Sequence, residues 1–171
     1  MNPEETIAKV ERYASYLSLS DLSYLDDMDI PVYAIVHNEI GNAFWGKGLN
    51  HELAKASALM EFVERKNASN MDNKKIITAS FNEIRDQAIS RFDLVPTNIQ
   101  RELYTKETYD NMEIQWFPCY SLFEDRDVYL PACLVGIQDK TDFSDRVDTN
   151  GLASGNTMEE ALLHGLCELI E

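Results

Sequence analysis

The sequence predicts an α/β fold, because runs of β-branched and aromatic residues alternate with amphipathic helical segments along its 171 residues. Apolar residues make up 44% of the chain and charged residues 26%, so a packed core is expected and disorder is not. The order of the segments allows both hairpins and helical crossovers, and therefore a mixed sheet. The chain contains no linker or low-complexity tract that would divide it.

The first part of the chain predicts a helix, a strand pair and a second helix. Pro3 and the two glutamates after it are typical of a helix start, and apolar residues follow at helical spacing. Residues 30–37 and 43–48 predict paired strands, with the turn at 38–42. The second helix is expected at 51–68, with Asn50 as its N-cap.

The later part predicts three strands, broken helical pieces and a final helix. A short strand is expected at 76–81 and helical pieces at 82–109, interrupted near Pro96. Two strands are predicted at 113–122 and 128–138, on either side of a charged turn. The final helix reaches Glu171 without a capping glycine, asparagine or proline, and an anion stands at its negative end. We therefore expect that the sequence is cut within a longer domain.

Net charge and cysteine spacing exclude several classes of partner. The 30 acidic residues outnumber the 15 basic ones, giving a net charge of −15 that repels nucleic acid and anionic lipid. No apolar stretch is long enough for a membrane span or a secretory signal. Cys119, Cys133 and Cys167 are odd in number and far apart, which indicates reduced thiols and a cytoplasmic protein.

Two acidic helical segments resemble each other. Residues 48–64 align with 155–171 at 6 of 17 positions, and both segments end in Glu-apolar-apolar-Glu. This match is compatible with an internal duplication or with chance in short helical segments. At about 100° per residue, Ser57, Glu61 and Glu64 share one helix face. Four polar residues share a face of the final helix: Glu160, His164, Glu168 and Glu171.

The apolar surroundings of the second acidic stripe make it a candidate site. Glutamates at this spacing are usually a solvated helix face, and Glu160 is also the acidic member of a capping box with Thr157. The rest of the final helix is almost entirely apolar, which indicates that the stripe faces the protein interior. Buried carboxylates that lie close together need cations, and carboxylate oxygens suit Mg²⁺, often with substrate phosphates. The residues alone therefore favour a site for Mg²⁺ and a nucleotide.

Both segments resemble motifs of the YcaO family, the ATP-dependent enzymes that activate peptide backbone amides. Residues 57–65, SALMEFVER, resemble the S-x-x-x-E-x-x-E-R motif. Residues 155–161, GNTMEEA, followed by Glu168 and Glu171, resemble the G-N-T-x-x-E-A segment and its later E-x-x-E-R. The arginine after the last glutamate and the later E-x-x-x-R element are absent from the sequence, and His164 stands where relatives have Gln or Glu. The resemblance implies a YcaO-type domain with two facing acidic helices, of which residues 1–171 are the N-terminal part.

The resemblance also implies the cofactors and the residues that would bind them. The cofactors are ATP and Mg²⁺. The implied metal ligands are Glu61, Glu64, Glu168 and Glu171. The implied nucleotide-binding residues are Ser57, Arg65, Asn156, Glu160 and His164. The family's catalytic chemistry starts when a nucleophile attacks a backbone amide; ATP phosphorylates the oxyanion, and phosphate leaves to give an azoline or a thioamide.

The sequence gives weaker indications of the reaction product and of the protein's partners than of its cofactors. Residues 148–157 and the absence of a peptide-clamp domain resemble thioamide-associated members, which implies a peptide or protein substrate and a sulfide-delivering partner protein. The alternative is a non-catalytic nucleotide-binding fragment or split-gene scaffold. The isolated chain is expected to be inactive and to bind ATP with Mg²⁺ weakly. Exposed apolar residues of its final helix are expected to cause association with itself or with a missing half.

Other candidates have ordinary explanations. Lys47 follows a glycine as a P-loop lysine would, but the G-x-x-x-x-G-K-[ST] motif is absent, so an exposed cation is expected. His37 is expected in a strand, and His51 in the solvated first turn of a helix.

Overall fold

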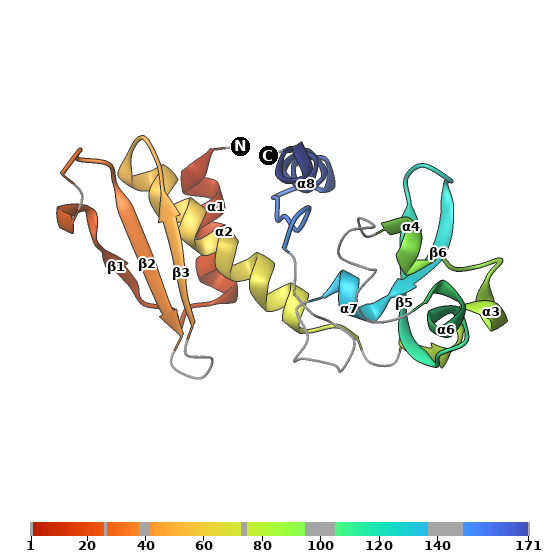
Figure 1. Cartoon of the computed structure of the whole chain (residues 1–171). Coiled ribbons are helices and arrows are strands. Elements are labelled where there is room, and N and C mark those ends of the chain that lie inside the picture. The colour runs from red at the N-terminus through yellow and green to blue at the C-terminus, as the bar shows by residue number, and fades with distance from the viewer. Residues whose placement is uncertain are drawn as a thin grey trace. The chain divides into compact units, whose positions relative to one another are not determined.

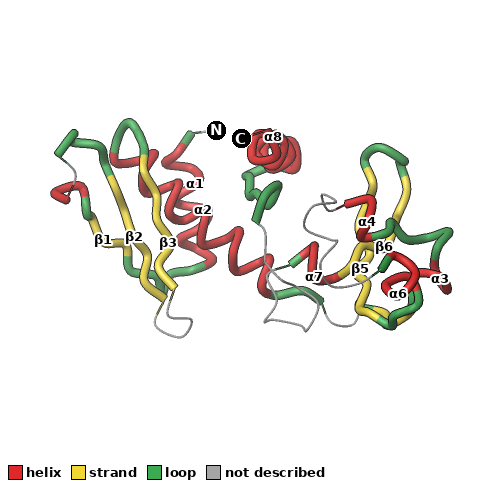
Figure 2. Tube along the Cα trace, in the orientation of Figure 1, coloured by secondary structure: helices red, strands yellow, loops and turns green. Residues whose placement is uncertain are grey.

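The computed structural model describes residues 2–25, 27–37, 42–72, 75–94, 105–136 and 149–170. The chain divides into two compact units (Figures 1 and 2), the first formed by residues 1–67 and 149–171 and the second by residues 68–148. The predicted α/β class is confirmed. The described strands form two separate sheets, and every strand pair in them is antiparallel.

The first unit is a three-stranded sheet covered on one face by two helices (Figure 1). Its sheet has the order β1-β2-β3, formed by Leu19–Asp21, Val32–His37 and Asn42–Lys47. Helix α1 spans Pro3–Tyr13 and helix α2 spans His51–Ser69. The 3-10 turn η1 spans Ser23–Leu25, and helix α8 spans Met158–Ile170.

The core of the first unit joins α1, α2 and the inner face of the sheet. Ile35 and Phe44 are register partners in β2 and β3, so both side chains point to the same face. There they pack with Leu59 and Phe62 of α2 and with Val10 of α1. Burial of these large apolar side chains is the main stabilising contribution that holds α2 on the sheet.

Gly46 lets α2 approach the sheet closely. A Cβ atom at this position would lie 2.1 Å from the backbone nitrogen of Ala58 and 2.3 Å from the backbone oxygen of Ala54. Only glycine fits, because the contacting atoms belong to helix backbone and cannot move aside. Gly48 and Gly155 meet the first turn of the following helix in the same way, at Ala54 and Ala161 respectively.

The second unit is built around a second antiparallel sheet. Its order is β4-β5-β6, formed by Ile77–Ala79, Ile114–Ser121 and Arg126–Pro131. Trp116 is fully buried beside Phe81 and donates a hydrogen bond from its indole nitrogen to the Ala79 carbonyl at 2.9 Å. The described part of the unit also contains four short helices: α3 (Phe81–Ile84), α4 (Arg91–Leu94), α6 (Lys106–Asp110) and α7 (Ala132–Val135).

Several boundaries differ from the sequence predictions. The strand predicted at 128–138 starts at Arg126 and ends at Pro131, where the chain turns into α7. Strand β1 was not predicted, because three half-polar residues carry no periodic signal. The predicted turn at 38–42 and the break near Pro96 lie mostly or wholly outside the described residues. The predicted N-cap of α2 is confirmed, since Asn50 Oδ1 accepts a hydrogen bond from the Leu53 amide at 2.8 Å.

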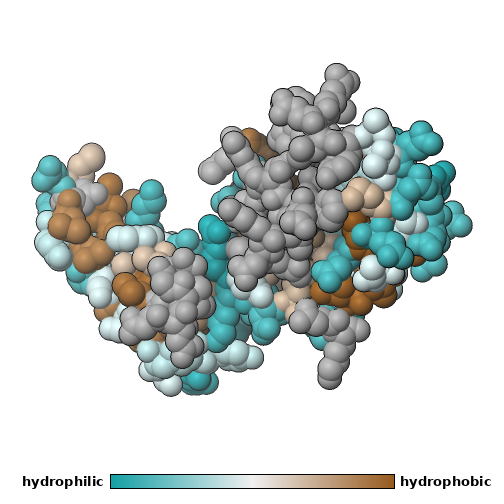
Figure 3. All heavy atoms as spheres, turned by 60° about the horizontal axis from the view of Figure 1, so that its bottom comes forward, coloured by the Kyte–Doolittle hydropathy of each residue, from teal (hydrophilic) through white to brown (hydrophobic). Residues whose placement is uncertain are grey.

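Helix α8 exposes much of its apolar surface. Leu166, Leu169 and Ile170 are 58%, 65% and 85% exposed. The expectation that part of this face lies in solvent is therefore confirmed, whereas a helix buried all round is not observed. Apolar residues also reach the visible surface of both units among polar ones (Figure 3). No helix in the described ranges combines the length and apolar character needed to cross a membrane.

Candidate functional site

The acidic stripe of α2 faces a cavity of about 700 Å³ within the first unit. Ser57, Glu61, Glu64 and Arg65 all line this cavity from α2. Glu61 is held in place from the sheet, because one oxygen of its carboxylate accepts a hydrogen bond from the Trp45 backbone amide at 2.8 Å. Strand β3 is an edge strand among the described strands, so this amide is free of the ladder and can bind a side chain.

The loop before α8 forms the opposite wall. Ser154 donates from its hydroxyl to the Met60 carbonyl of α2 at 3.0 Å, and its own carbonyl lies 3.2 Å from His164 Nδ1. Glu160 accepts a hydrogen bond from the Asn156 amide at 2.8 Å, while its own amide donates to the Thr157 hydroxyl at 3.3 Å. In a standard capping box the Glu160 carboxylate would accept a hydrogen bond from the amide of the N-cap residue, Thr157. Here it accepts from the amide of Asn156, one residue earlier, so the predicted capping box is present in a shifted form.

The cavity brings together eight of the nine residues that the sequence predicted for the site. Four of them lie on α2: Ser57, Glu61, Glu64 and Arg65. The other four belong to α8 and the loop before it: Asn156, Glu160, His164 and Glu168. Glu171 lies outside the described residues. The two predicted stripes thus line one cavity, on segments separated by about ninety residues of chain.

Glu64 is a carboxylate of the cavity whose pKa is raised. Burial raises its pKa, and the negative charges of Glu61 and Glu168 raise it further. The Arg65 guanidinium and the Ser154 backbone amide act in the opposite direction, but the net pKa is still raised. A carboxylate in this environment favours either a proton or a cation.

Glu160 has the opposite electrostatic setting. Hydrogen bonds from Asn156, first from its backbone amide and then from its side chain, lower the pKa of Glu160. The nearby His164 acts in the same direction. Glu160 is therefore held ionised at the rim of the cavity, beside the start of α8, where the helix dipole also favours an anion.

Arg65 has unused hydrogen-bonding capacity next to these carboxylates. Its Nε lies 3.9 Å from the Glu64 carboxylate, beyond hydrogen-bond distance. This nitrogen is buried and has no hydrogen-bond partner among the residues that the structure describes. An anionic group in the cavity would satisfy it. In the same ranges, no three His, Cys, Asp or Glu side chains converge closely enough to hold a metal ion by themselves.

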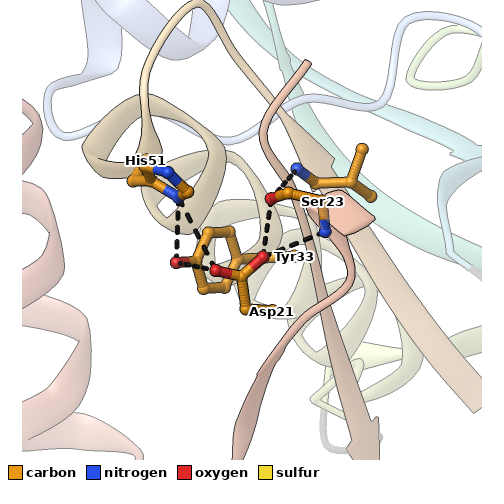
Figure 4. A network of polar contacts seen from close by, with 5 residues as sticks. Asp21, Ser23, Tyr33 and His51 are labelled. Carbon is orange, nitrogen blue, oxygen red and sulfur yellow. Dashed lines mark hydrogen bonds and ion pairs between the residues drawn. The ribbon is translucent and has the colours of Figure 1, made fainter. Parts of the chain in front are cut away.

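A separate polar network fixes the first turn of α2 to the sheet (Figure 4). The Asp21 carboxylate accepts hydrogen bonds from the Ser23 hydroxyl and amide, at 2.6 and 3.0 Å, and from the Tyr33 hydroxyl at 3.0 Å. His51 Nδ1 lies 3.2 Å from the Tyr33 hydroxyl. The His51 side chain is about half exposed, as expected from its place in the first turn of a helix. Its contact with the Tyr33 hydroxyl also connects it to the sheet. None of these four residues lines the cavity, so the network is structural.

Sequence reasoning missed two residues that connect the walls of the cavity. Thr6 is buried on α1 and accepts a hydrogen bond from the Asn156 side-chain amide at 2.9 Å. Ser154 bonds to α2 and to α8. Ser154 stands within the motif region and could have been considered, whereas Thr6 carries no local signal.

Lys47 is exposed at the edge of the cavity. His37 lies in β2 as predicted, but its side chain is not among those that the structure describes.

A protein family model and curated proteins match this chain. The family model described as YcaO cyclodehydratase, ATP- and Mg²⁺-binding, matches residues 45–171. An uncharacterized protein in the tfuA 3′ region of Rhizobium leguminosarum bv. trifolii is 29% identical over the whole chain. An uncharacterized protein of Methanothermobacter thermautotrophicus is also 29% identical over the whole chain. The chain spans 41% and 45% of the lengths of these two relatives.

Solved structures show the same fold. A heterocyclase in complex with substrate and cofactor has a TM-score of 0.76 and 26% identity, and the chain covers 27% of it. The YcaO protein of Methanopyrus kandleri bound with AMPPCP and Mg²⁺ has a TM-score of 0.71 and 24% identity, with 43% covered. The E. coli microcin synthetase McbBCD complex with pro-MccB17 bound has a TM-score of 0.63 and 17% identity, with 39% covered.

Proposed function

The chain belongs to the YcaO family, and from this we propose that it forms the Mg²⁺- and ATP-binding part of an enzyme that activates a peptide backbone amide. The observation that carries the proposal is the cavity in which both predicted acidic stripes meet. Because the chain spans less than half of its relatives' length, the activity of the complete protein is part of the proposal.

The carboxylates of the cavity fit Mg²⁺ chemically. Glu61, Glu64 and Glu168 offer only oxygen ligands, which are the ligands that Mg²⁺ prefers. Burial and the charges of Glu61 and Glu168 raise the pKa of Glu64, and a divalent cation would offset this penalty on its ionised form. Since no three acidic side chains converge in the described part of the chain, phosphate oxygens would have to complete the coordination. Glu171 is proposed as a further ligand from the family motif alone.

The remaining polar residues fit a nucleotide. Arg65 would bind a phosphate oxygen through its unsatisfied Nε. Ser57, Asn156, Glu160 and His164 would bind other polar groups of ATP around the cavity wall. When bound, ATP with Mg²⁺ supplies an electrophilic γ-phosphoryl group whose charge the metal offsets. The protein's own part is to position the phosphates and to balance their charge.

The proposed reaction is phosphorylation of an amide oxygen. A nucleophile adds to the carbonyl carbon of a backbone amide, and the resulting oxyanion takes the γ-phosphoryl group while ADP leaves. Loss of phosphate then restores a double bond at the former carbonyl carbon. External sulfide as the nucleophile gives a thioamide, whereas a Cys, Ser or Thr side chain gives an azoline.

We favour a thioamide as the product, because residues 148–157 resemble thioamide-associated members of the family. The substrate would be a peptide or protein, and a partner protein would deliver sulfide. Two solved relatives support a peptide substrate and protein partners, since one is a heterocyclase in complex with substrate and another is a complex with pro-MccB17 bound.

The exposed apolar face of α8 would be covered either by further polypeptide or by a second copy of the chain. A homo-oligomer is therefore part of the proposal. The competing candidate is a nucleotide-binding fragment or scaffold without catalysis that needs a second chain.

Calorimetric titration of the chain with ATP and Mg²⁺ tests the binding site. We expect weak binding that requires Mg²⁺, with a Kd on the order of 0.1–1 mM, about −4 to −5.5 kcal/mol. Glu168→Gln should weaken it at least about tenfold. Glu159→Gln is the matched control, because Glu159 is exposed on the same helix and does not line the cavity. Equal effects of both substitutions would place the nucleotide elsewhere.

Mass spectrometry of candidate peptides separates the catalytic proposal from the scaffold. After incubation with ATP, Mg²⁺ and sulfide, a thioamide increases the peptide mass and an azoline decreases it by one water. ATP binding by the complete protein without any peptide product or ATP turnover would favour the scaffold.

A further inference from the structure

Helix α1 contributes a buried hydroxyl to the cavity, although it precedes the residues that match the family model. Thr6 is only 4% exposed and lines the cavity. Its Oγ1 lies 3.4 Å from the Asn2 carbonyl, to which it donates, and 2.9 Å from Asn156 Nδ2, from which it accepts. Because the hydroxyl has a single proton, its bond to Asn2 leaves the oxygen lone pairs available to accept from Asn156.

The donor end of the Asn156 side-chain amide is held by Thr6. One Nδ2 proton goes to the Thr6 hydroxyl at 2.9 Å, and the same side chain also helps to lower the pKa of the Glu160 carboxyl. The backbone of Asn156 is fixed as well, since its carbonyl accepts from Lys9 Nζ at 3.2 Å and its amide donates to Glu160. Asn156 lines the cavity, and a flip of its planar amide would exchange the positions of its oxygen and its nitrogen.

We propose that Thr6 is a positioning residue that keeps the Asn156 amide turned so that its oxygen, not its nitrogen, is available to a cation in the cavity. This inference rests on the proposed function. A metal ion binds an amide oxygen but is repelled by the protons of an NH₂ group. Without an acceptor at position 6, the amide loses the hydrogen bond that distinguishes its two orientations, and the flipped form becomes accessible.

The test compares Thr6→Val with Thr6→Ser in the whole chain. Valine has nearly the shape of threonine but cannot accept a hydrogen bond, whereas serine keeps the hydroxyl. We expect Thr6→Val to weaken Mg²⁺-dependent ATP binding three- to tenfold, and Thr6→Ser to change it less than twofold. In NMR spectra without nucleotide, the side-chain NH₂ protons of Asn156 should exchange faster with water in Thr6→Val than in the wild type.

A double-mutant cycle separates positioning from packing. In the Asn156→Asp background both ends of the side chain are oxygen, so its orientation no longer matters. Thr6→Val should therefore have less than a twofold effect there. An equal loss of affinity in both backgrounds would overturn the inference, because Thr6 would then act through packing alone.

Failure of the proposed function gives a different result. If the wild-type chain shows no Mg²⁺-dependent binding of ATP at millimolar concentrations, the proposed site is wrong. The inferred role of the Asn156 oxygen is then wrong as well. If the wild type responds but Thr6→Val changes neither the affinity nor the NH₂ exchange of Asn156, the site stands and the inference about Thr6 is overturned.

Discussion

Replacing Glu64 by glutamine is expected to stabilise the chain while it damages the proposed site. The Glu64 side chain is only 19% exposed. Its raised pKa, caused by burial and by the charges of Glu61 and Glu168, means that ionising it costs free energy in the folded state. Glutamine occupies nearly the same volume without the charge. The substitution should therefore remove this cost and also remove a proposed Mg²⁺ ligand.

The expected gain follows from the opposing contributions at Glu64. Burial and the charges of Glu61 and Glu168 penalise the ionised form, and the contacts with Arg65 and the Ser154 amide offset part of that penalty. We expect Glu64→Gln to raise the free energy of unfolding near neutral pH by an amount on the order of 1 kcal/mol, the typical size of a single-substitution effect. For a chain of this size, that corresponds to an increase in Tm of about 2–4 °C.

The pH dependence gives the sign of the effect. A carboxyl whose pKa is higher in the folded state than in the unfolded state costs stability as the pH rises through the folded pKa. The gain from Glu64→Gln should therefore be present at about pH 7.5 and should vanish at about pH 4, where wild-type Glu64 is largely protonated.

Thermal unfolding followed by circular dichroism at both pH values measures this difference. Glu11→Gln is the control, because Glu11 is an exposed glutamate in the same unit. If Glu64→Gln lowered the Tm at neutral pH, or shifted it equally at both pH values, the electrostatic description of the cavity would be refuted.

Three further substitutions test how the site is built. Ser154→Ala removes the hydrogen bond to the Met60 carbonyl and should lower the free energy of unfolding by about 1 kcal/mol in urea denaturation; no loss would mean that this loop is not held by α2. Gly46→Ala would place a Cβ 2.1 Å from the Ala58 nitrogen and should cost about 3 kcal/mol or more, visible as lost helical circular dichroism, whereas a normal Tm would contradict the close approach. Leu166→Lys on the exposed face of α8 should reduce self-association in sedimentation experiments at equal concentration; unchanged association would exclude this face as the contact.

The sequence predicted the main helices and the central strand pair because their signals are local. The N-cap at Asn50 and the helical spacing after it defined α2, and a run rich in β-branched and aromatic residues defined β2. The acidic stripes could also be predicted from the sequence, because helix periodicity alone places Glu61 and Glu64 on one face.

The parts that could not be predicted depend on contacts between distant residues. Thr6 meets Asn156 across 150 positions, and Glu61 meets the backbone of Trp45 at the sheet edge. Neither contact leaves a pattern in the sequence, because each depends on how closely a helix approaches its neighbour. The end of the strand at Pro131 was missed for a related reason: the apolar run continues into α7, and a short apolar run does not distinguish strand from helix.

The location of the bound metal tests the central claim most directly. Mn²⁺ shares the oxygen-ligand preference of Mg²⁺ and broadens NMR signals of nearby residues. In a titration of the chain with ATP and trace Mn²⁺, we predict that amide signals broaden most around Glu61 and Glu64 in α2 and Glu168 in α8, and that Glu168→Gln reduces this broadening. Broadening that is centred outside these helices, or that is the same with and without ATP, would contradict a nucleotide-linked metal site between the two acidic stripes.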